Sequence, residues 1–331
     1  MKKFSKKYQE IITPENLLLA WEEFLRGKKR RNDVAVFQRR LMDNIFDLHR
    51  DLKEKTYQHG IYQAFNISDP KPRNIHKANI RDRLLHRLLY QETYQYFDQH
   101  FINDSYSCRL DKGTHRAICR FSEMAQKISN NNQRTVWILK CDIRKFFASI
   151  DHQILKDILG RYIEDEDLLW LFGQVIDSFN TSGKIGIGLP LGNLTSQLLV
   201  NVYMNEFDQF VKAELKIKYY IRYADDFVFF GESKDNFISL LSKLENFLSQ
   251  HLKLSLHPKK TFIKTLASGL DFLGWVQFSE HRVLRTTTKN RMLRRIERNN
   301  EPATLAAYSA LLKHGNAYRL SKSAGLVDRL L

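Results

Sequence analysis

The sequence predicts an α+β protein built around a split βαβ sheet. The first observation is a short, apolar and β-branched run at 135–141 that leads directly into Asp142. The second is a pair of β-rich runs at 218–223 and 227–230, separated by an acidic pair, which is typical of a hairpin. The third is a stretch at 193–212 with apolar residues at every fourth position, which predicts a helix between strand and hairpin.

The elements around this centre follow from hydrophobic spacing and turn residues. We expect helices over 14–58 and 81–97, the first interrupted by a basic run at 26–31 that is typical of a solvated loop. Residues 60–80 are expected to be extended, with a turn at 68–72. The remaining predictions are Asn193 as an N-cap, a helix at 237–248, a strand or tight hairpin at 270–275, and a basic helical C-terminus of about 50 residues.

The composition indicates a globular, nucleic-acid-binding protein. The 331 residues include 53 Lys and Arg against 37 Asp and Glu, a net charge of +16 at pH 7. A basic excess of this size favours a polyanionic partner, nucleic acid before membrane, although a merely soluble basic protein would show the same excess. The length is typical of about two domains, and a hydrophobic content of 43% excludes a disordered chain.

Several protein classes are excluded by what the sequence lacks. No apolar run approaches the roughly 18 residues that a membrane span needs. The N-terminal segment has neither the apolar core nor the cleavage site of a secretory signal. Cys108, Cys119 and Cys141 lie outside any CxxC pair, which argues against a zinc ribbon or a disulfide framework. We therefore expect a cytoplasmic protein with no membrane partner.

Three acidic residues form the constellation that carries chemistry. Asp142 ends a predicted strand, and Asp225 and Asp226 lie at a predicted hairpin turn, so adjacent strands could bring Asp142 beside Asp225. Clustered carboxylates repel one another unless cations lie between them, and two Mg²⁺ ions can hold the attacking and leaving oxygens of a phosphoryl displacement. A polar β-turn would also explain Tyr223–Asp226 alone, but the joint occurrence, in order and on these elements, favours two-metal nucleotidyl transfer.

These segments resemble the motifs of reverse transcriptases over about residues 60–280. The matching segments are Tyr223–Asp226 for YxDD, Asp142–His152 for the first catalytic motif, Lys71–Arg73 through Arg81–Arg83 for the fingers, Ser105–His115 for the segment after it, and Phe272–Trp275 for the primer grip. The resemblance implies a right-hand polymerase fold with a split βαβ palm sheet and a helical thumb. Its implied regions are fingers with an N-terminal extension at 1–135, palm at 136–278 with a helical insertion at about 150–187, and thumb at 279–331.

One departure from the common reverse transcriptase motifs points to a particular subfamily. Most reverse transcriptases carry QGxxxSP at the start of the pocket helix, whereas this chain has Leu191, Gly192 and then Asn-Leu-Thr-Ser-Gln197. This variant, and the tail at 312–319, resemble the reverse transcriptases of diversity-generating retroelements. That family makes error-prone cDNA from a template RNA for mutagenic retrohoming, with dNTPs as substrates, an RNA/DNA duplex as product and a small basic accessory protein as partner. A small retron or phage-defence reverse transcriptase remains an alternative; a non-catalytic RNA-binding chaperone is disfavoured because all three acidic positions are intact.

The resemblance also assigns roles to single residues. Asp142, Asp225 and Asp226 are the expected catalytic residues, and with the Ile143 carbonyl they form the expected site for two Mg²⁺ ions, with Mn²⁺ as a substitute. Phe147 is expected to select deoxynucleotides by a clash with the 2′-OH, while one of Phe146 and Phe147 must be core. The other expected nucleotide-binding residues are Lys71, Arg73, Leu191, Gly192, Gln197 and Lys260, the last either as general acid for pyrophosphate or only as a charge near phosphates.

A basic stripe is predicted near the C-terminus. Arg291, Arg294, Arg295 and Arg298 have the spacing of one helical face, while Met292 and Ile296 fall off that face, where they could be buried. Such a stripe suits a thumb helix that follows a duplex backbone. A solvated helical face would have the same pattern, so both interpretations stay open.

Overall fold

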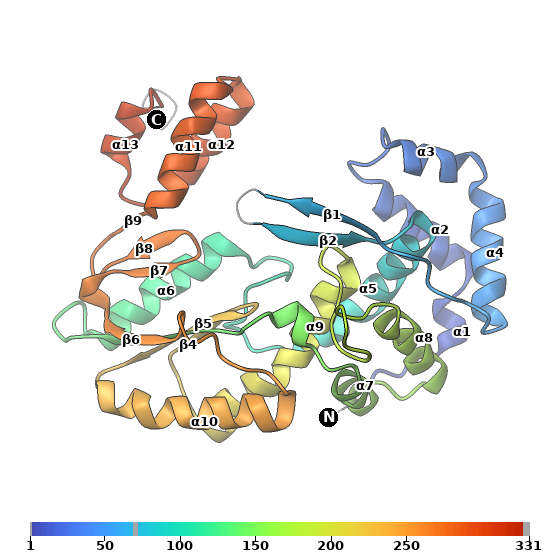
Figure 1. The fold of residues 1–331 in the computed structure, drawn as a ribbon, viewed down its shortest axis with the longest axis horizontal. Coiled ribbons are helices and arrows are strands. Elements are labelled where there is room, and N and C mark those ends of the chain that lie inside the picture. The colour runs from blue at the N-terminus through green and yellow to red at the C-terminus, as the bar shows by residue number, and fades with distance from the viewer. Residues whose placement is uncertain (1, 69–71, 327–331) are drawn as a thin grey trace. The chain divides into compact units, whose positions relative to one another are not determined.

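The computed structural model describes residues 2–68 and 72–326 (Figure 1). The chain forms two compact units, each made of three segments. The first consists of 1–103, 143–217 and 244–256, and the second of 104–142, 218–243 and 257–331. The fingers, palm and thumb boundaries at 135 and 278 stay predictions. In the described part of the chain, no helix has both the length and the apolar character that a membrane crossing requires.

Helices dominate the first unit. They are α1 (Tyr8–Ile11), α2 (Pro14–Leu25), α3 (Asn32–Arg39), α4 (Leu41–Lys53), α5 (Ile80–His100), α7 (His152–Tyr162), α8 (Glu166–Asp177) and α9 (Leu194–Gln209), with the 3₁₀ turn η1 (Phe146–Ser149), the π-helical turn η2 (Phe210–Glu214) and the C-terminal part of α10 (Lys234–Leu252). The long helix α5 packs against both α2 and α9. The predicted interruption at 26–31 is confirmed, since α2 ends at Leu25 and α3 begins at Asn32.

A two-stranded hairpin projects from this helical unit. Strand β1 (Gln63–Ile67) pairs antiparallel with β2 (Arg73–Lys77), and Ile67 lies opposite Arg73 (Figure 1). The extended character predicted for 60–80 is confirmed at these two strands. The central part of the predicted turn, 69–71, lies outside the described residues.

The second unit contains the predicted split βαβ sheet. Its four strands are β3 (Trp137–Asp142), β4 (Tyr220–Tyr223), β5 (Asp226–Gly231) and β6 (Phe262–Thr265), in the order β4-β5-β3-β6, and each neighbouring pair is antiparallel. Helix α6 (Thr114–Ile128) contacts β4 and β5. Phe121, Phe230 and Phe272 form an aromatic centre of the core cluster that includes this sheet.

The last strand of the sheet corrects the sequence prediction. The strand or tight hairpin predicted at 270–275 is the last element of the expected split βαβ order, but β6 takes that place in the sheet. The tight hairpin itself is confirmed. The segment instead forms the hairpin of β7 (Leu270–Phe272) and β8 (Trp275–Gln277), which joins β9 (Arg282–Leu284) in a separate sheet after the short turn η3 (Leu266–Ser268). The four residues of β6 are too short and too mixed in polarity to stand out in a sequence.

The C-terminal helices pack on this second sheet. They are α11 (Thr286–Arg298), α12 (Pro302–Leu312) and α13 (Tyr318–Ser323) (Figure 1). Met292 is fully buried with Trp275 and Leu312, and Ile296 packs against the same cluster, so the predicted burial of both off-stripe residues is confirmed. Gly315 is required there, because a Cβ at this position would lie 2.1 Å from the Trp275 ring.

Asn193 is the N-cap residue of α9, as predicted, but its side chain has another role. Helix α9 does begin at Leu194, but the Asn193 side chain makes no capping hydrogen bond. Its amide instead donates to the His76 carbonyl at 2.8 Å and accepts weakly from the Ala78 N–H at 3.4 Å. The asparagine therefore ties the start of α9 to the end of β2, a contact that only the tertiary structure provides.

Candidate active site

Strand register brings two of the three predicted carboxylates together. In the β3–β5 pair, Asp142 lies directly opposite Asp226. Residues opposite one another in an antiparallel pair have Cβ atoms about 4.5–5.5 Å apart. Asp225 precedes Asp226 in the hairpin loop that joins β4 to β5. The closest strand partner of Asp142 is therefore Asp226, where the sequence analysis expected Asp225.

The hairpin loop is short and conformationally demanding. Tyr223 pairs with Asp226, so only Ala224 and Asp225 lie in the loop. Ala224 has a φ of 56°, in the left-handed region that two-residue hairpin loops require. Such a backbone costs free energy in a residue with a side chain, so the surroundings must hold the loop in place.

A buried arginine holds that loop, and sequence reasoning missed it. Arg222 on β4 is fully buried and donates from Nη1 to the Ala224 carbonyl at 3.2 Å and from Nη2 to the Ser105 Oγ at 3.1 Å. Its backbone pairs with Asp104 and Tyr106. The segment expected to follow the fingers motif therefore supports the catalytic loop. The available signal was a single charge inside an apolar β-run.

Two lysines neutralise the carboxylates. Lys260 Nζ lies 2.9 Å from both carboxylate oxygens of Asp142. Lys140 Nζ lies 3.2 Å from Oδ2 of Asp226. The Lys140 side chain is only 12% exposed, whereas that of Lys260 is 47% exposed and so has room to move. Lys260 was predicted at the nucleotide; Lys140 was not predicted at all.

The surroundings of Asp226 clearly disfavour the charged form of its carboxyl group. The pKa of Asp226 is raised to about 6, chiefly by burial and also by the nearby carboxylates of Asp142 and Asp225, against the opposing effect of Lys140. Its Oδ1 is buried and has no hydrogen-bond partner among the described residues. A carboxylate oxygen in this condition is suited to a cation.

The carboxylates suit a divalent cation that takes further ligands from outside the protein. The described residues contain no cluster of three or more His, Cys, Asp or Glu side chains placed to hold a metal by themselves. Mg²⁺ does not require one, because it is commonly held by one or two carboxylates together with substrate phosphates and water. Ile143, predicted to add a carbonyl ligand, is buried and forms a backbone bridge with Leu256.

Several of the predicted nucleotide-binding residues lie in the first unit, at the junction of β2 and α9, whereas Lys260 lies in the second. The Leu191 carbonyl accepts from the His76 N–H at 3.0 Å. Gly192 has a φ of 104°, and a Cβ there would lie 2.7 Å from Ile75. Leu191 and Gln197 are half-buried, and Arg73 is exposed at the start of β2. Lys71 lies outside the described residues.

The two phenylalanines after the first catalytic motif differ in burial. Phe146 is buried, with 3% of its surface exposed, and Phe147 is half-buried. Their rings meet edge to face at 5.6 Å. Phe146 is therefore the core residue of the pair, which leaves Phe147 as the candidate for the sugar contact.

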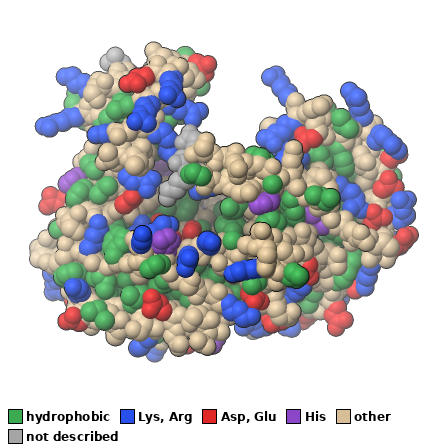
Figure 2. Space-filling view, in the orientation of Figure 1, with side chains coloured by type: hydrophobic (Ala, Val, Ile, Leu, Met, Phe, Trp, Pro, Cys, Tyr) green, Lys and Arg blue, Asp and Glu red, His purple; other side chains and the backbone are tan. Residues whose placement is uncertain are grey.

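The predicted basic stripe lies on α11. Arg294, Arg295 and Arg298 are exposed, and Arg291 is partly exposed. Figure 2 shows Lys and Arg side chains gathered over the C-terminal helices. The position of the stripe agrees with either a duplex contact or a solvated face.

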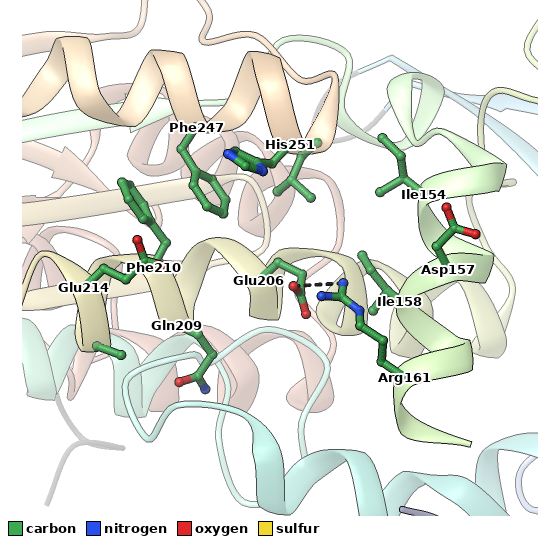
Figure 3. Close-up of a pocket in the computed structure, with 12 residues that line it drawn as sticks. Ile154, Asp157, Ile158, Arg161, Glu206, Gln209, Phe210, Glu214, Phe247 and His251 are labelled. Carbon is green, nitrogen blue, oxygen red and sulfur yellow. Dashed lines mark ion pairs between the residues drawn. The ribbon is translucent and has the colours of Figure 1, made fainter. Parts of the chain in front are cut away.

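A cavity lies in the first unit, and none of the predicted site residues is among those that line it. It has a volume of about 450 Å³ and is lined by residues of α7, α9, η2 and α10. Figure 3 shows its two sides, an ion pair between Arg161 and Glu206 and a stack of Phe210 on Phe247.

Comparison with known proteins decides the family. Residues 67–277 match the family described as reverse transcriptase (RNA-dependent DNA polymerase). The chain belongs to this family. The matched reverse transcriptase domain contains the three carboxylates, both lysines and the predicted pocket residues. The prediction of the reverse transcriptase family is confirmed by this match.

Curated relatives of this reverse transcriptase include intron-encoded proteins. The chain is 26% identical to Protein YkfC of Escherichia coli over 67% of its length, 20% identical to the group II intron-encoded protein LtrA of Lactococcus lactis over 82%, and 21% identical to the putative COX1/OXI3 intron 2 protein of Saccharomyces cerevisiae over 65%. It spans 66%, 56% and 30% of the lengths of these three relatives.

A solved structure confirms the fold. The apo telomerase of Candida tropicalis, truncated from its C-terminal domain, superposes with a TM-score of 0.52 at 14% identity, over 70% of this chain and 55% of that one. At this identity the likeness concerns the fold alone. Together with the family match, it confirms the predicted α+β right-hand polymerase fold.

Proposed function

We propose that this reverse transcriptase synthesises DNA on an RNA template by two-metal nucleotidyl transfer, with dNTPs as substrates. The observation that carries the proposal is the register that sets Asp142 opposite Asp226, with Asp225 in the adjoining loop. Mg²⁺ bound there, or Mn²⁺ in its place, would supply charge neutralisation for the attacking and leaving oxygens. The polyanionic partners agree with the net charge of +16.

The protein's own residues do the remaining work. The Asp142 carboxylate is held by the ammonium group of Lys260. The side chain that carries this ammonium is long and about half-exposed. An incoming triphosphate offers that ammonium a competing anion, so Lys260 would pass from Asp142 to the phosphates and leave both carboxylate oxygens available. This exchange places a proton donor beside the pyrophosphate as it leaves.

The test is Asp225→Asn in a primer-extension assay on an RNA template. The substitution removes a negative charge but not the shape, so incorporation should be abolished while RNA affinity stays nearly unchanged. Asp235→Asn, the same change at an exposed position at the start of α10, serves as the matched control. Full extension by the Asp225 variant would exclude the assignment.

We further propose that the enzyme serves a diversity-generating retroelement, makes error-prone cDNA for mutagenic retrohoming and works with a small basic accessory protein. Support comes from the Leu191 and Gln197 departures at the pocket helix. Leucine keeps the bulk of glutamine but has no donor or acceptor, so one polar contact near the nucleotide is lost. A contact of this kind is worth roughly 0.5–1.5 kcal/mol, or about 2- to 13-fold in discrimination.

Leu191→Gln tests this finer proposal. Misincorporation counted at each template base should fall opposite adenine while processivity is preserved. An unchanged error spectrum would move the cause of infidelity out of this pocket. A retron or phage-defence role is the second candidate, and a gene neighbourhood without template and variable repeats would favour it.

A further inference from the structure

Lys140 connects two hairpins of the second unit through one ammonium group. Its Nζ lies 3.2 Å from Oδ2 of Asp226, next to the catalytic loop, and donates to the backbone carbonyl of Asp271 on β7 at 2.6 Å. We propose that Lys140 is a positioning residue that holds the Asp226 carboxylate in register with the β7–β8 hairpin. The proposal rests on the proposed polymerase function and assigns a role to a residue outside every predicted site.

The location of Lys140 makes this connection direct. It precedes Asp142 by two residues on β3, so both side chains lie on the same face of the sheet. The side chain is 12% exposed, and a nearly buried ammonium is retained only where its hydrogen bonds are satisfied. Here one donor reaches a carboxylate and another a carbonyl, so its position is fixed from two directions.

The two hairpins share a hydrophobic core that includes Phe230 and Phe272, and Lys140 adds a polar link between them. Among the described residues, β4, β5, β3 and β6 form one sheet, and β7, β8 and β9 form another, without strand pairing between them. The Asp271 carboxylate is already engaged by Arg285 at 3.0 Å, which fixes the β7 end of the connection. The ammonium also lies 5.8 Å from the centre of the Phe272 ring.

The consequence concerns the primer end. Residues Phe272–Trp275 resemble the primer grip, and the carboxylates act on the primer's terminal 3′ oxygen, so the two hairpins must agree in position. Without Lys140, each hairpin should keep its own fold and its part of the shared core, while the Asp226 carboxylate loses the polar link that sets its position relative to β7. Chemistry should then slow while binding of the duplex is retained.

The experiment compares Lys140→Met, Lys140→Arg and wild type in single-turnover incorporation on a primed RNA template. Methionine keeps the apolar stem without the ammonium, so the incorporation rate should fall roughly 10- to 100-fold, as for other partners that orient catalytic ligands. The primer–template dissociation constant, measured by fluorescence anisotropy, should stay within about twofold, because phosphate contacts dominate affinity. Arginine should restore part of the rate.

Lys264→Met is the matched control. Lys264 lies on β6 opposite Ile138, and its ammonium sits over the Phe262 ring at 5.4 Å. It is close enough to Lys140 and Asp271 for their charges to act on it, so it matches the electrostatic setting of Lys140 without the contact to Asp226. Its removal should leave the incorporation rate near that of wild type. Equal losses for Lys140→Met and Lys264→Met would overturn the proposal in favour of a general charge effect.

A double-mutant cycle with Asp226→Asn completes the test. If Lys140 acts through Asp226, the double variant should be no slower than the slower single variant; additive losses would overturn the proposal. Should Lys140→Met fail to fold, Lys140→Gln retains a donor and permits the same cycle. If the wild type incorporates nucleotides and the Lys140 variant is equally fast, this inference alone is overturned. If the wild type itself is inactive, the proposed polymerase function is overturned.

Discussion

Single residues in this reverse transcriptase take their character from their tertiary neighbours. Phe146 and Phe147 are identical in type and adjacent in sequence, yet one is core and the other half-buried. Asp226 differs from most carboxylates in having a pKa of about 6, because burial and two neighbouring acids outweigh one lysine. Residue type therefore indicates which residues could take part in a site, and burial decides which of them are available to do so.

Phe147→Ala should raise ribonucleotide incorporation relative to deoxynucleotide incorporation. The loss of a steric clash of this size is worth about 1–3 kcal/mol, or roughly 10- to 200-fold in the ratio. Competitive incorporation of rNTP and dNTP measures it. Phe146→Leu is the control, since a change in the core should lower the melting temperature and leave the ratio alone. A constant ratio in the Phe147 variant would assign that ring to packing.

His86 should make stability depend on pH. Its pKa is lowered to about 3, chiefly by burial and also by the charges of His59 and Arg83, and its Nε2 lies 3.2 Å from the Nε2 of His59. The unfolded chain binds a proton at His86 below about pH 6.5, whereas the folded chain does not until about pH 3, so stability falls as pH drops between these values. The slope from this group approaches about 1.4 kcal/mol per pH unit.

Thermal unfolding between pH 4.5 and 7.5 checks this prediction. His86→Gln should flatten the dependence, and the same change at the exposed His281 should not. Identical pH slopes for wild type and His86→Gln would mean that another group controls acid sensitivity.

At the scale of elements, the contact between β2 and the start of α9 is the most constrained feature of the predicted pocket. The Asn193 amide donates to the His76 carbonyl at the end of β2, and the His76 N–H donates to the Leu191 carbonyl. Gly192 lies against Ile75 on the same strand. These contacts fix the loop that resembles the nucleotide pocket to the strand that begins with Arg73.

Gly192→Ala should therefore weaken nucleotide binding. The new Cβ would meet Ile75 at 2.7 Å on a backbone with φ of 104°, which combines a clash with strain. Strain of this kind costs about 1–3 kcal/mol, so the KM for dNTP should rise by roughly tenfold or more, with primer–template affinity unchanged. Steady-state kinetics give the split between the two.

Gly186→Ala provides the matched control, since Gly186 also has a positive φ, 74°, but nothing within 4 Å of a Cβ. It isolates backbone strain from the clash. Ile75→Ala should partly rescue the Gly192 variant by removing the methyl group that it meets. A normal KM in Gly192→Ala would show that this loop does not shape the nucleotide site.

At the scale of the whole molecule, the charge of +16 should govern affinity for nucleic acid. The logarithm of the binding constant should fall linearly with the logarithm of salt concentration. Charge reversal of Arg294 and Arg295 on α11 should reduce the magnitude of this slope by about the amount that two phosphate contacts contribute. Salt titrations of primer–template binding measure it, with Lys243→Glu on α10 as an exposed control. An unchanged slope would assign the stripe to solvent.

The sequence by itself determined the local elements and the chemistry they could carry. Periodicity predicted the helices and the β4–β5 hairpin, and the acidic residues predicted the catalytic set, because spacing along a chain and residue type are local properties. The family followed from the same residues. The pairing of Asp142 with Asp226, the strand that completes the sheet, and the roles of Arg222 and Lys140 were decided by the tertiary structure alone. Register and burial depend on contacts between residues far apart in sequence, and a buried charge is indistinguishable from an exposed one until the partner that neutralises it is in place.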